Sequence, residues 1–228
     1  MMPNLTQRSF RRDAGDRAVL WIRPALIDHH FGTKWPVGKA RIAQLNRWLP
    51  KPIVNAMRPG LKKREPFIIP AAHFAKRTPI TQEARYKLLK DFISKGDAIH
   101  DTQWHAKLTE ELHTQGVARH KDIAMRSTAE IEAFLREYVG GLVTSLRTTG
   151  FSRDVSSFES MVVVNADGTL SKTGSGNHRF AIAHILQLER YPVVLAGAHE
   201  DWWRAQNLGA PQTDRILSCL PALQDRYS

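Results

Sequence analysis

The chain has 228 residues, of which 42% are hydrophobic and 24% are charged, as in an ordinary globular protein. Its one cysteine, Cys219, excludes an intrachain disulfide framework and a multi-thiolate zinc site. The formal net charge is +11, and all of the excess lies in residues 1–95, where 20 Lys and Arg face 6 Asp and Glu. Such a segment is expected to attract nucleic acid, anionic lipid or an anionic glycan. A solvated basic face that only aids solubility is the simpler alternative.

The first residues do not have the pattern of a targeting signal. Residues 9–12 resemble the start of a twin-arginine signal, but the apolar run over residues 18–22 is too short and is flanked by Arg17 and Arg23. The sequence also has no stretch approaching the roughly 20 apolar residues of a membrane span. We therefore expect a cytoplasmic protein, with peripheral contact to the inner membrane left open by the charge of residues 1–95.

The first half of the chain is rich in proline. Residues 1–18 are polar and are expected to be frayed. The prolines of residues 18–79 predict short helices and loops rather than a regular sheet, with one helix over residues 42–49. Helices are also predicted over residues 82–95 and 102–114, because apolar side chains recur there at helical spacing.

A longer helix is predicted over residues 127–150. Its first four residues have the spacing of a capping box, apolar residues follow at helical spacing, and Gly150 ends the pattern. The adjacent Gly140 and Gly141 indicate a bend or a close helix contact.

The pattern changes to strands after residue 155. The predicted strands are residues 161–164, 169–172 and 191–195, and the predicted helices are residues 177–188, 198–206 and 213–220. The fold class is therefore α/β or α+β, with a small mixed sheet. We divide the chain into a basic, largely helical extension over residues 1–95 and a domain over residues 96–228, whose core is residues 140–203.

Residues 173–179 are the most informative stretch. A strand, a loop of small residues and a helix start form a phosphate-binding layout, because loop N–H groups and the helix N-terminus both favour an anion. In the first helical turn, Arg179 offers a planar fork for phosphate and His178 offers a donor or a proton. Basic residues there disfavour the helix, a conflict that a bound anion resolves. The candidate ligand-binding residues are Thr173, Gly174, Ser175, Gly176, Asn177, His178 and Arg179.

Residues 162–202 resemble the ParB/sulfiredoxin superfamily. The matching motifs are Val-Asn-Ala-Asp-Gly at 164–168, Gly-Asn-His-Arg-Phe-Ala-Ile-Ala at 176–183 and Pro-Val-Val at 192–194. The resemblance extends over about residues 140–203 and rests on a short G-x-H-R motif in the expected order of strands and turns. In the family this element binds nucleotide phosphates: ATP in sulfiredoxins and free-serine kinases, CTP in chromosome-partitioning ParB proteins. It implies the same role for residues 176–179 here.

Two departures narrow the implied function. Sulfiredoxin has its nucleophilic Cys where this sequence has Asn177, so the motif excludes sulfinic-acid repair. ParB proper has a G-E-R-R motif and a following helix-turn-helix domain, so a partitioning role is not expected. The sequence is more similar to ParB-like proteins found among bacterial polysaccharide and lipopolysaccharide biosynthesis functions. The matching positions are Asp101-Thr102, Ser145, Gly150-Phe151, residues 176–183, His199 and Trp202.

This resemblance implies nucleotide-linked chemistry on a glycan or its precursor. Our leading hypothesis is a phosphotransferase that uses ATP, or CTP, with Mg²⁺ and acts on an anionic acceptor, either a glycan or a lipid-linked molecule. Phosphoryl transfer needs phosphate clamps, a metal ion and a base for the acceptor hydroxyl. We assign the clamps to His178 and Arg179, and Asp101 is a catalytic candidate that can equally cap the next helix. The other candidate bases are Glu159, Asp167 and His199, of which the last two also fit a turn and a helix start.

No dedicated metal site is predicted. His100, His105 and His113 lie near Asp101, but their spacings of five and eight do not align on one helical face, and no zincin motif is present.

Two alternative functions stay open. One is a DNA-binding protein or nuclease of ParB-like type that uses the basic residues 1–95, and the other is a non-catalytic nucleotide-sensing module. Trp202 and Trp203 can stack a base or a sugar, although a position in the core or at its rim is the simpler expectation.

Overall fold

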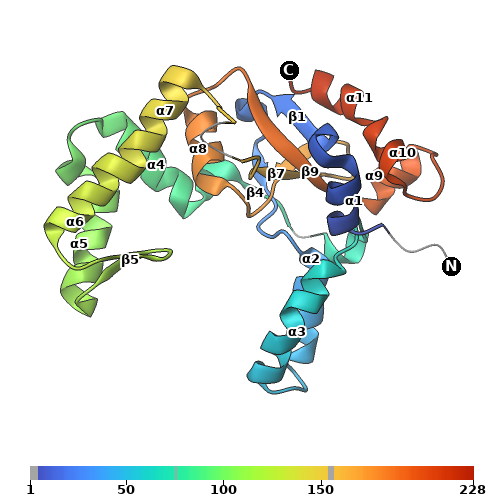
Figure 1. Cartoon of the computed structure of the whole chain (residues 1–228), viewed down its shortest axis with the longest axis horizontal. Coiled ribbons are helices and arrows are strands. Elements are labelled where there is room, and N and C mark those ends of the chain that lie inside the picture. The colour runs from blue at the N-terminus through green and yellow to red at the C-terminus, as the bar shows by residue number, and fades with distance from the viewer. Residues whose placement is uncertain (1–4, 75, 154–156) are drawn as a thin grey trace.

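The computed structural model describes residues 5–74, 76–153 and 157–228, which fold around a mixed seven-stranded sheet (Figure 1). The central strand β9 (Tyr191–His199) is buried along its whole length. It pairs antiparallel with β1 (Val19–Ile22) and parallel with β7 (Met161–Val164). The remaining strands are β8 (Leu170–Lys172), β2 (His29–His30), β4 (Thr78–Pro79) and β3 (Ile68–Ile69). Their order is β1-β9-β7-β8-β2-β4, with β3 pairing the end of β9, and the predicted mixed α/β class is confirmed.

Residues 18–79 contribute four of these strands, so the expectation of helices and loops without a regular sheet is wrong. Several prolines of this region lie where a missing N–H is tolerated, whereas Pro59 stands inside a helix. Pro79 belongs to β4 at the edge of the sheet, while Pro24 and Pro36 begin a 3₁₀ turn and the helix α2 (Pro36–Leu45). The sheet thus combines strands from both of the ranges into which the sequence was divided.

Two groups of helices lie on either side of the sheet (Figure 1). The first contains α4 (Ala84–Lys95), α5 (Gln103–Gln115), α6 (Thr128–Ala133), a π-helical segment (Phe134–Gly140), α7 (Gly141–Thr149) and α8 (Asn177–Ile185). The second contains α1 (Gln7–Ala14), α9 (Glu200–Ala205), α10 (Thr213–Leu217) and α11 (Leu220–Asp225). A small hairpin of β5 (Ala118–His120) and β6 (Ile123–Met125) packs against α5.

The helices predicted from apolar spacing over residues 82–95, 102–114 and 127–150 are confirmed, the last as α6, the π-helical segment and α7. Other boundaries differ, and the helix predicted over residues 177–188 ends at Ile185. The strand predicted to end at residue 195 continues to His199, whose Nδ1 accepts the N–H of Asp201 at 3.0 Å and caps α9.

The helix predicted over residues 213–220 is two helices. Pro221 stands in the first turn of α11, a position that suits proline, whereas it would break the interior of one continuous helix.

The prediction that residues 1–18 are frayed is wrong for α1, and residues 1–4 lie outside the described part. Thr6 and Ser9 form a reciprocal capping box at the start of α1. Phe10 and Ala14, one turn apart, are buried in the core. A short apolar stripe therefore holds a helix whose other residues are polar.

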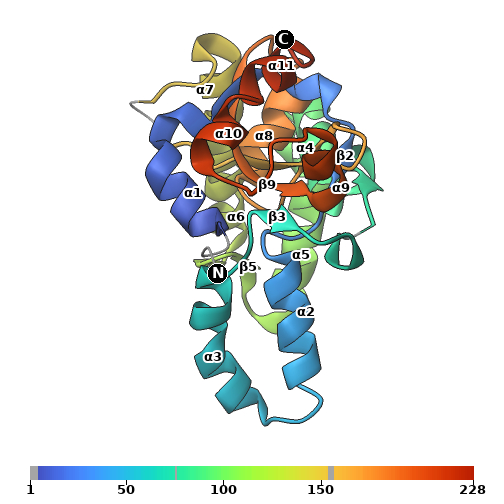
Figure 2. The same ribbon diagram turned by 90° about the vertical axis from the view of Figure 1, so that its right-hand side faces the viewer.

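Helices α2 and α3 (Lys51–Lys63) form a hairpin, here called the arm, that extends away from the rest of the molecule (Figure 2). Its base is fixed by Glu65, whose buried carboxylate accepts the N–H groups of Val37 and Gly38 at 2.8 and 2.7 Å. The helix predicted over residues 42–49 is misplaced, because the chain turns at residues 46–50 between α2 and α3. Among the described helices, none is long and apolar enough to cross a bilayer.

Candidate functional site

The loop over residues 173–176 joins β8 to α8 in a shape that only glycine allows at its last position. Gly176 has φ +62°, in the left-handed region, and is the N-cap of α8. A Cβ on Gly176 would lie 2.7 Å from Ser160 Oγ and 2.8 Å from Ser160 N. Ser160 Oγ also donates to the carbonyl of Gly176 at 3.2 Å. The loop is therefore held tightly against the segment that leads into β7.

Lys172, at the end of β8, supports this loop from inside. Its side chain is buried, and Nζ donates to the carbonyls of Thr173 and Ser175 and to Asn177 Oδ1. Burial lowers the pKa of Lys172 to about 7. Because the ammonium group donates hydrogen bonds to the inward-facing carbonyls of the loop, it fixes the loop conformation from the buried side.

The backbone N–H groups of residues 174–179 remain available to a ligand. Within the described part of the chain, no group accepts a hydrogen bond from any of them. Consecutive free N–H groups at a helix N-terminus form a nest for an anion, to which the helix dipole adds partial positive charge.

Residues 174–179 line a cleft of about 510 Å³. Its cationic residues come from elements far apart in the chain: Arg11 in α1, Lys34 before α2, Arg85 in α4, Lys121 between β5 and β6, and Arg179 in α8. Lys121 has φ +53°, a conformation uncommon for a side chain other than glycine. Among the described lining residues the one carboxylate is Glu159. The cleft is therefore suited to a ligand with several negative charges.

Arg179, predicted as a phosphate clamp, lies at the cleft and is partly exposed. Its Nη1 donates to Glu159 Oε2 at 3.1 Å. This pair orients the guanidinium, which keeps further N–H groups for a ligand.

His178, the second predicted clamp, lies at the back of the cleft. It is buried, its ring stacks on Trp104 with centroids 6.1 Å apart, and His120 lies 4.9 Å away. Burial, together with nearby cations, lowers the pKa of His178 to about 3. The imidazole is therefore neutral at pH 7 and can donate or accept one hydrogen bond but cannot add positive charge. Its Nε2 is buried without a partner among the described residues.

Asp101 is not among the described residues that line the cleft. It lies exposed in the turn Ile99–Asp101, and Thr102 rather than Asp101 caps α5, its Oγ1 accepting from His105 N at 3.1 Å. The other candidate bases divide between the cleft and structural positions. Glu159 lines the cleft, whereas Asp167 accepts the N–H of Thr169 in its turn.

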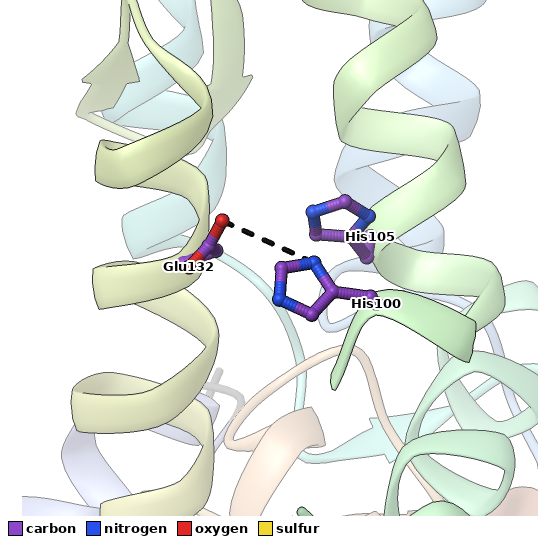
Figure 3. A group of neighbouring side chains, drawn as sticks. All are labelled: His100, His105 and Glu132. Carbon is purple, nitrogen blue, oxygen red and sulfur yellow. Dashed lines mark ion pairs between the residues drawn. The ribbon is translucent and has the colours of Figure 1, made fainter. Parts of the chain in front are cut away.

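The structure brings together three side chains of metal-ligating type that no sequence motif joins. His100 before α5, His105 in α5 and Glu132 in α6 have ligand atoms within 4.8 Å of one another (Figure 3). His100 Nδ1 lies 3.9 Å from Glu132 Oε1. Two imidazoles and a carboxylate are a donor set that Zn²⁺ accepts. Asp101 and His113, also considered from the sequence, are outside this group.

Lys172 and four of the cleft cations were missed from the sequence. The missed cations are Arg11, Lys34, Arg85 and Lys121. They lie on separate elements with no shared motif, so a local pattern could not join them. Lys172 had one signal, its place directly before the small-residue loop. Trp202 and Trp203 are buried in the core, as expected.

No protein-family model, curated protein or solved structure matches this chain. The resemblance to the ParB/sulfiredoxin superfamily therefore stays a prediction, and the geometry of the cleft is what bears on function.

Proposed function

We propose that the protein is a phosphotransferase that binds the phosphates of ATP, or of CTP, in this cleft. The observation that carries the proposal is the run of free N–H groups over residues 174–179, set among five cationic side chains. A triphosphate needs many donors and positive charges, and both are concentrated here. The G-x-H-R resemblance adds nucleotide as the ligand and a glycan or its precursor as the acceptor.

In this proposal each part of the cleft has a binding role. The N–H groups of the loop and of the first turn of α8 hold the phosphates, and Arg179 and Lys34 neutralise their charge. Neutral His178 donates one hydrogen bond from the back of the cleft. Phosphoryl transfer depends mainly on such positioning and electrostatic stabilisation, which the chain's own residues provide.

Mg²⁺ fits the cleft through Glu159. The ion is usually held by one or two carboxylates together with phosphate oxygens, and Glu159 is the described carboxylate of the lining. When bound, the ion neutralises charge on the phosphates. The pair with Arg179 keeps Glu159 at the cleft wall.

Thermal unfolding with ATP, CTP and ADP in the presence of Mg²⁺ tests the proposal. A ligand that binds the folded state raises the melting temperature. We expect a shift that disappears in Arg179→Ala and persists in Arg23→Ala, which removes an exposed arginine outside the cleft. If no nucleotide shifts the melting temperature of the wild-type protein, the proposal is wrong.

Turnover separates an enzyme from a sensor. A phosphotransferase releases ADP only with an acceptor present, whereas a nucleotide-sensing module binds nucleotide without releasing product.

The arm favours a second candidate function, binding to DNA. Residues 36–64 contain no Asp or Glu, and their basic residues are Lys39, Arg41, Arg47, Lys51, Arg58, Lys62, Lys63 and Arg64. Trp48, at the turn between α2 and α3, is 82% exposed. A projecting basic hairpin can follow a phosphate backbone, with affinity that falls as salt rises.

A further inference from the structure

A second pocket, of about 430 Å³, adjoins the cleft. Arg11, Lys34 and Met161 line both, so one ligand in each would meet at these shared residues. We define the second pocket by Arg8, Arg11, Arg12, Lys34, Trp35 and Lys62. These residues come from α1, from the segment before α2 and from the end of α3, which places the pocket where the arm joins the sheet.

No carboxylate among the described lining residues balances the positive charge of the second pocket. Five of its defining residues are cationic, and no Asp or Glu is among the described residues that line it. Helix α1 places Arg8, Arg11 and Arg12 at i, i+3 and i+4, which puts their like charges on one face. The exposed Asp13 pairs with Arg12 at 2.8 Å. A bound anion would relieve the remaining repulsion.

Trp35 gives the second pocket a flat apolar surface. Lys62 Nζ lies 4.3 Å from the centre of its ring and Lys34 Nζ lies 5.5 Å from it. An aromatic ring next to cations can pack against the body of a ligand whose charged group pairs with those cations.

We propose that the second pocket binds a phosphomonoester with a flat or apolar body, and that this ligand is the phosphoryl acceptor. The acceptor role rests on the proposed function. The phosphate of the ligand pairs with the arginines of α1, its body packs on Trp35, and a free hydroxyl faces the cleft past Arg11 and Lys34.

In the transfer, the acceptor hydroxyl oxygen bonds to the γ-phosphorus. The bond from that phosphorus to the β,γ-bridging oxygen breaks, the nucleoside diphosphate leaves, and the hydroxyl proton passes to solvent.

Calorimetric titration of the nucleotide-free full chain with phenyl phosphate and with inorganic phosphate tests the pocket. Phenyl phosphate is expected to bind about fivefold more tightly, because its ring packs on Trp35. Trp35→Ala should remove this preference, and Trp35→Phe should restore part of it. Arg8→Ala combined with Arg12→Ala should weaken both ligands at least about tenfold.

Two matched controls separate this proposal from the function of the cleft. Arg179→Ala removes a cation that lines the cleft but not the second pocket, and Arg23→Ala removes one that lines neither, so both should keep the wild-type preference for phenyl phosphate over inorganic phosphate. If only Arg179→Ala loses phenyl phosphate, the second pocket is overturned and the cleft proposal stands. If the Arg8 and Trp35 variants lose it but no nucleotide binds, the anion pocket stands and its acceptor role fails. Unchanged binding in the Arg8/Arg12 and Trp35 variants would overturn the pocket outright.

Discussion

Single residues decide whether the loop over residues 173–176 can form, and two glycines in it give a matched comparison. Gly176 has a positive φ and no room for a Cβ beside Ser160, whereas a Cβ at Gly174 would meet its nearest atom, the carbonyl of Gly32, at an ordinary 3.6 Å. Gly176→Ala is therefore expected to lower the free energy of unfolding by about 1–3 kcal/mol and to abolish nucleotide binding. Gly174→Ala should fold and bind nearly as the wild type does. Denaturant unfolding and calorimetry measure both effects, and equal behaviour of the two variants would contradict the geometry.

Lys172 should make phosphate binding depend on pH. Its pKa is lowered to about 7 by burial, so the ammonium form is lost as pH rises through neutrality. A phosphate on the loop favours the charged amine and raises its pKa, so affinity should fall between about pH 6 and 8, with uptake of a proton on binding near pH 7. Calorimetry in two buffers of different ionisation enthalpy measures that uptake.

The control for this prediction is Lys172→Arg, which keeps a positive charge at position 172 that does not titrate near pH 7. Lys172→Arg should bind without proton uptake near pH 7, provided that its far-UV circular dichroism is native. His178 is already neutral in this range, because burial lowers its pKa to about 3, so it adds nothing to the uptake. Uptake that persists in Lys172→Arg would assign the proton to another group.

At the scale of elements, the arm is expected to bind DNA but to contribute little to the stability of the fold. In α3 the one buried residue is Val54, and α2 buries residues only in its first turn, at Pro36, Val37 and Gly38. Replacing residues 41–59 with a short Gly-Ser linker should therefore shift the melting temperature by only a few degrees. Affinity for duplex DNA should fall and lose most of its salt dependence, because the phosphate contacts of the arm are gone.

Fluorescence anisotropy with labelled duplex DNA over a range of salt concentrations measures this change. Arg23→Ala, which keeps the arm, is the control. If the shortened protein binds DNA with wild-type affinity and salt dependence, the arm is not the DNA-binding element. A large loss of melting temperature would instead show that the arm packs on the body.

At the scale of the whole molecule, the parts that could be predicted are those with local signals. The capping box and apolar spacing over residues 127–150, and the strand, turn and loop order over residues 161–179, are such signals, and the structure has these elements. The two-residue strands β2, β3 and β4 have none, because their pairing with distant strands defines them. The sequence predicted the loop and the first helical turn of the cleft but not its other cationic residues. Tertiary packing alone brings Arg85 and Lys121 to the same cleft as Arg179.

The pairing of β1 with β9 sets the order in which the chain can assemble. Val19 is opposite Val194, so β1 must wait unpaired until the much later strand β9 has been made. The long chain between β1 and β9 closes slowly, because its conformational entropy is lost before the contacts between the two strands form. Until then, the most basic part of the nascent chain stays uncovered beside the ribosome with an apolar strand unpaired. We therefore expect native structure to form late, after β9 has left the exit tunnel.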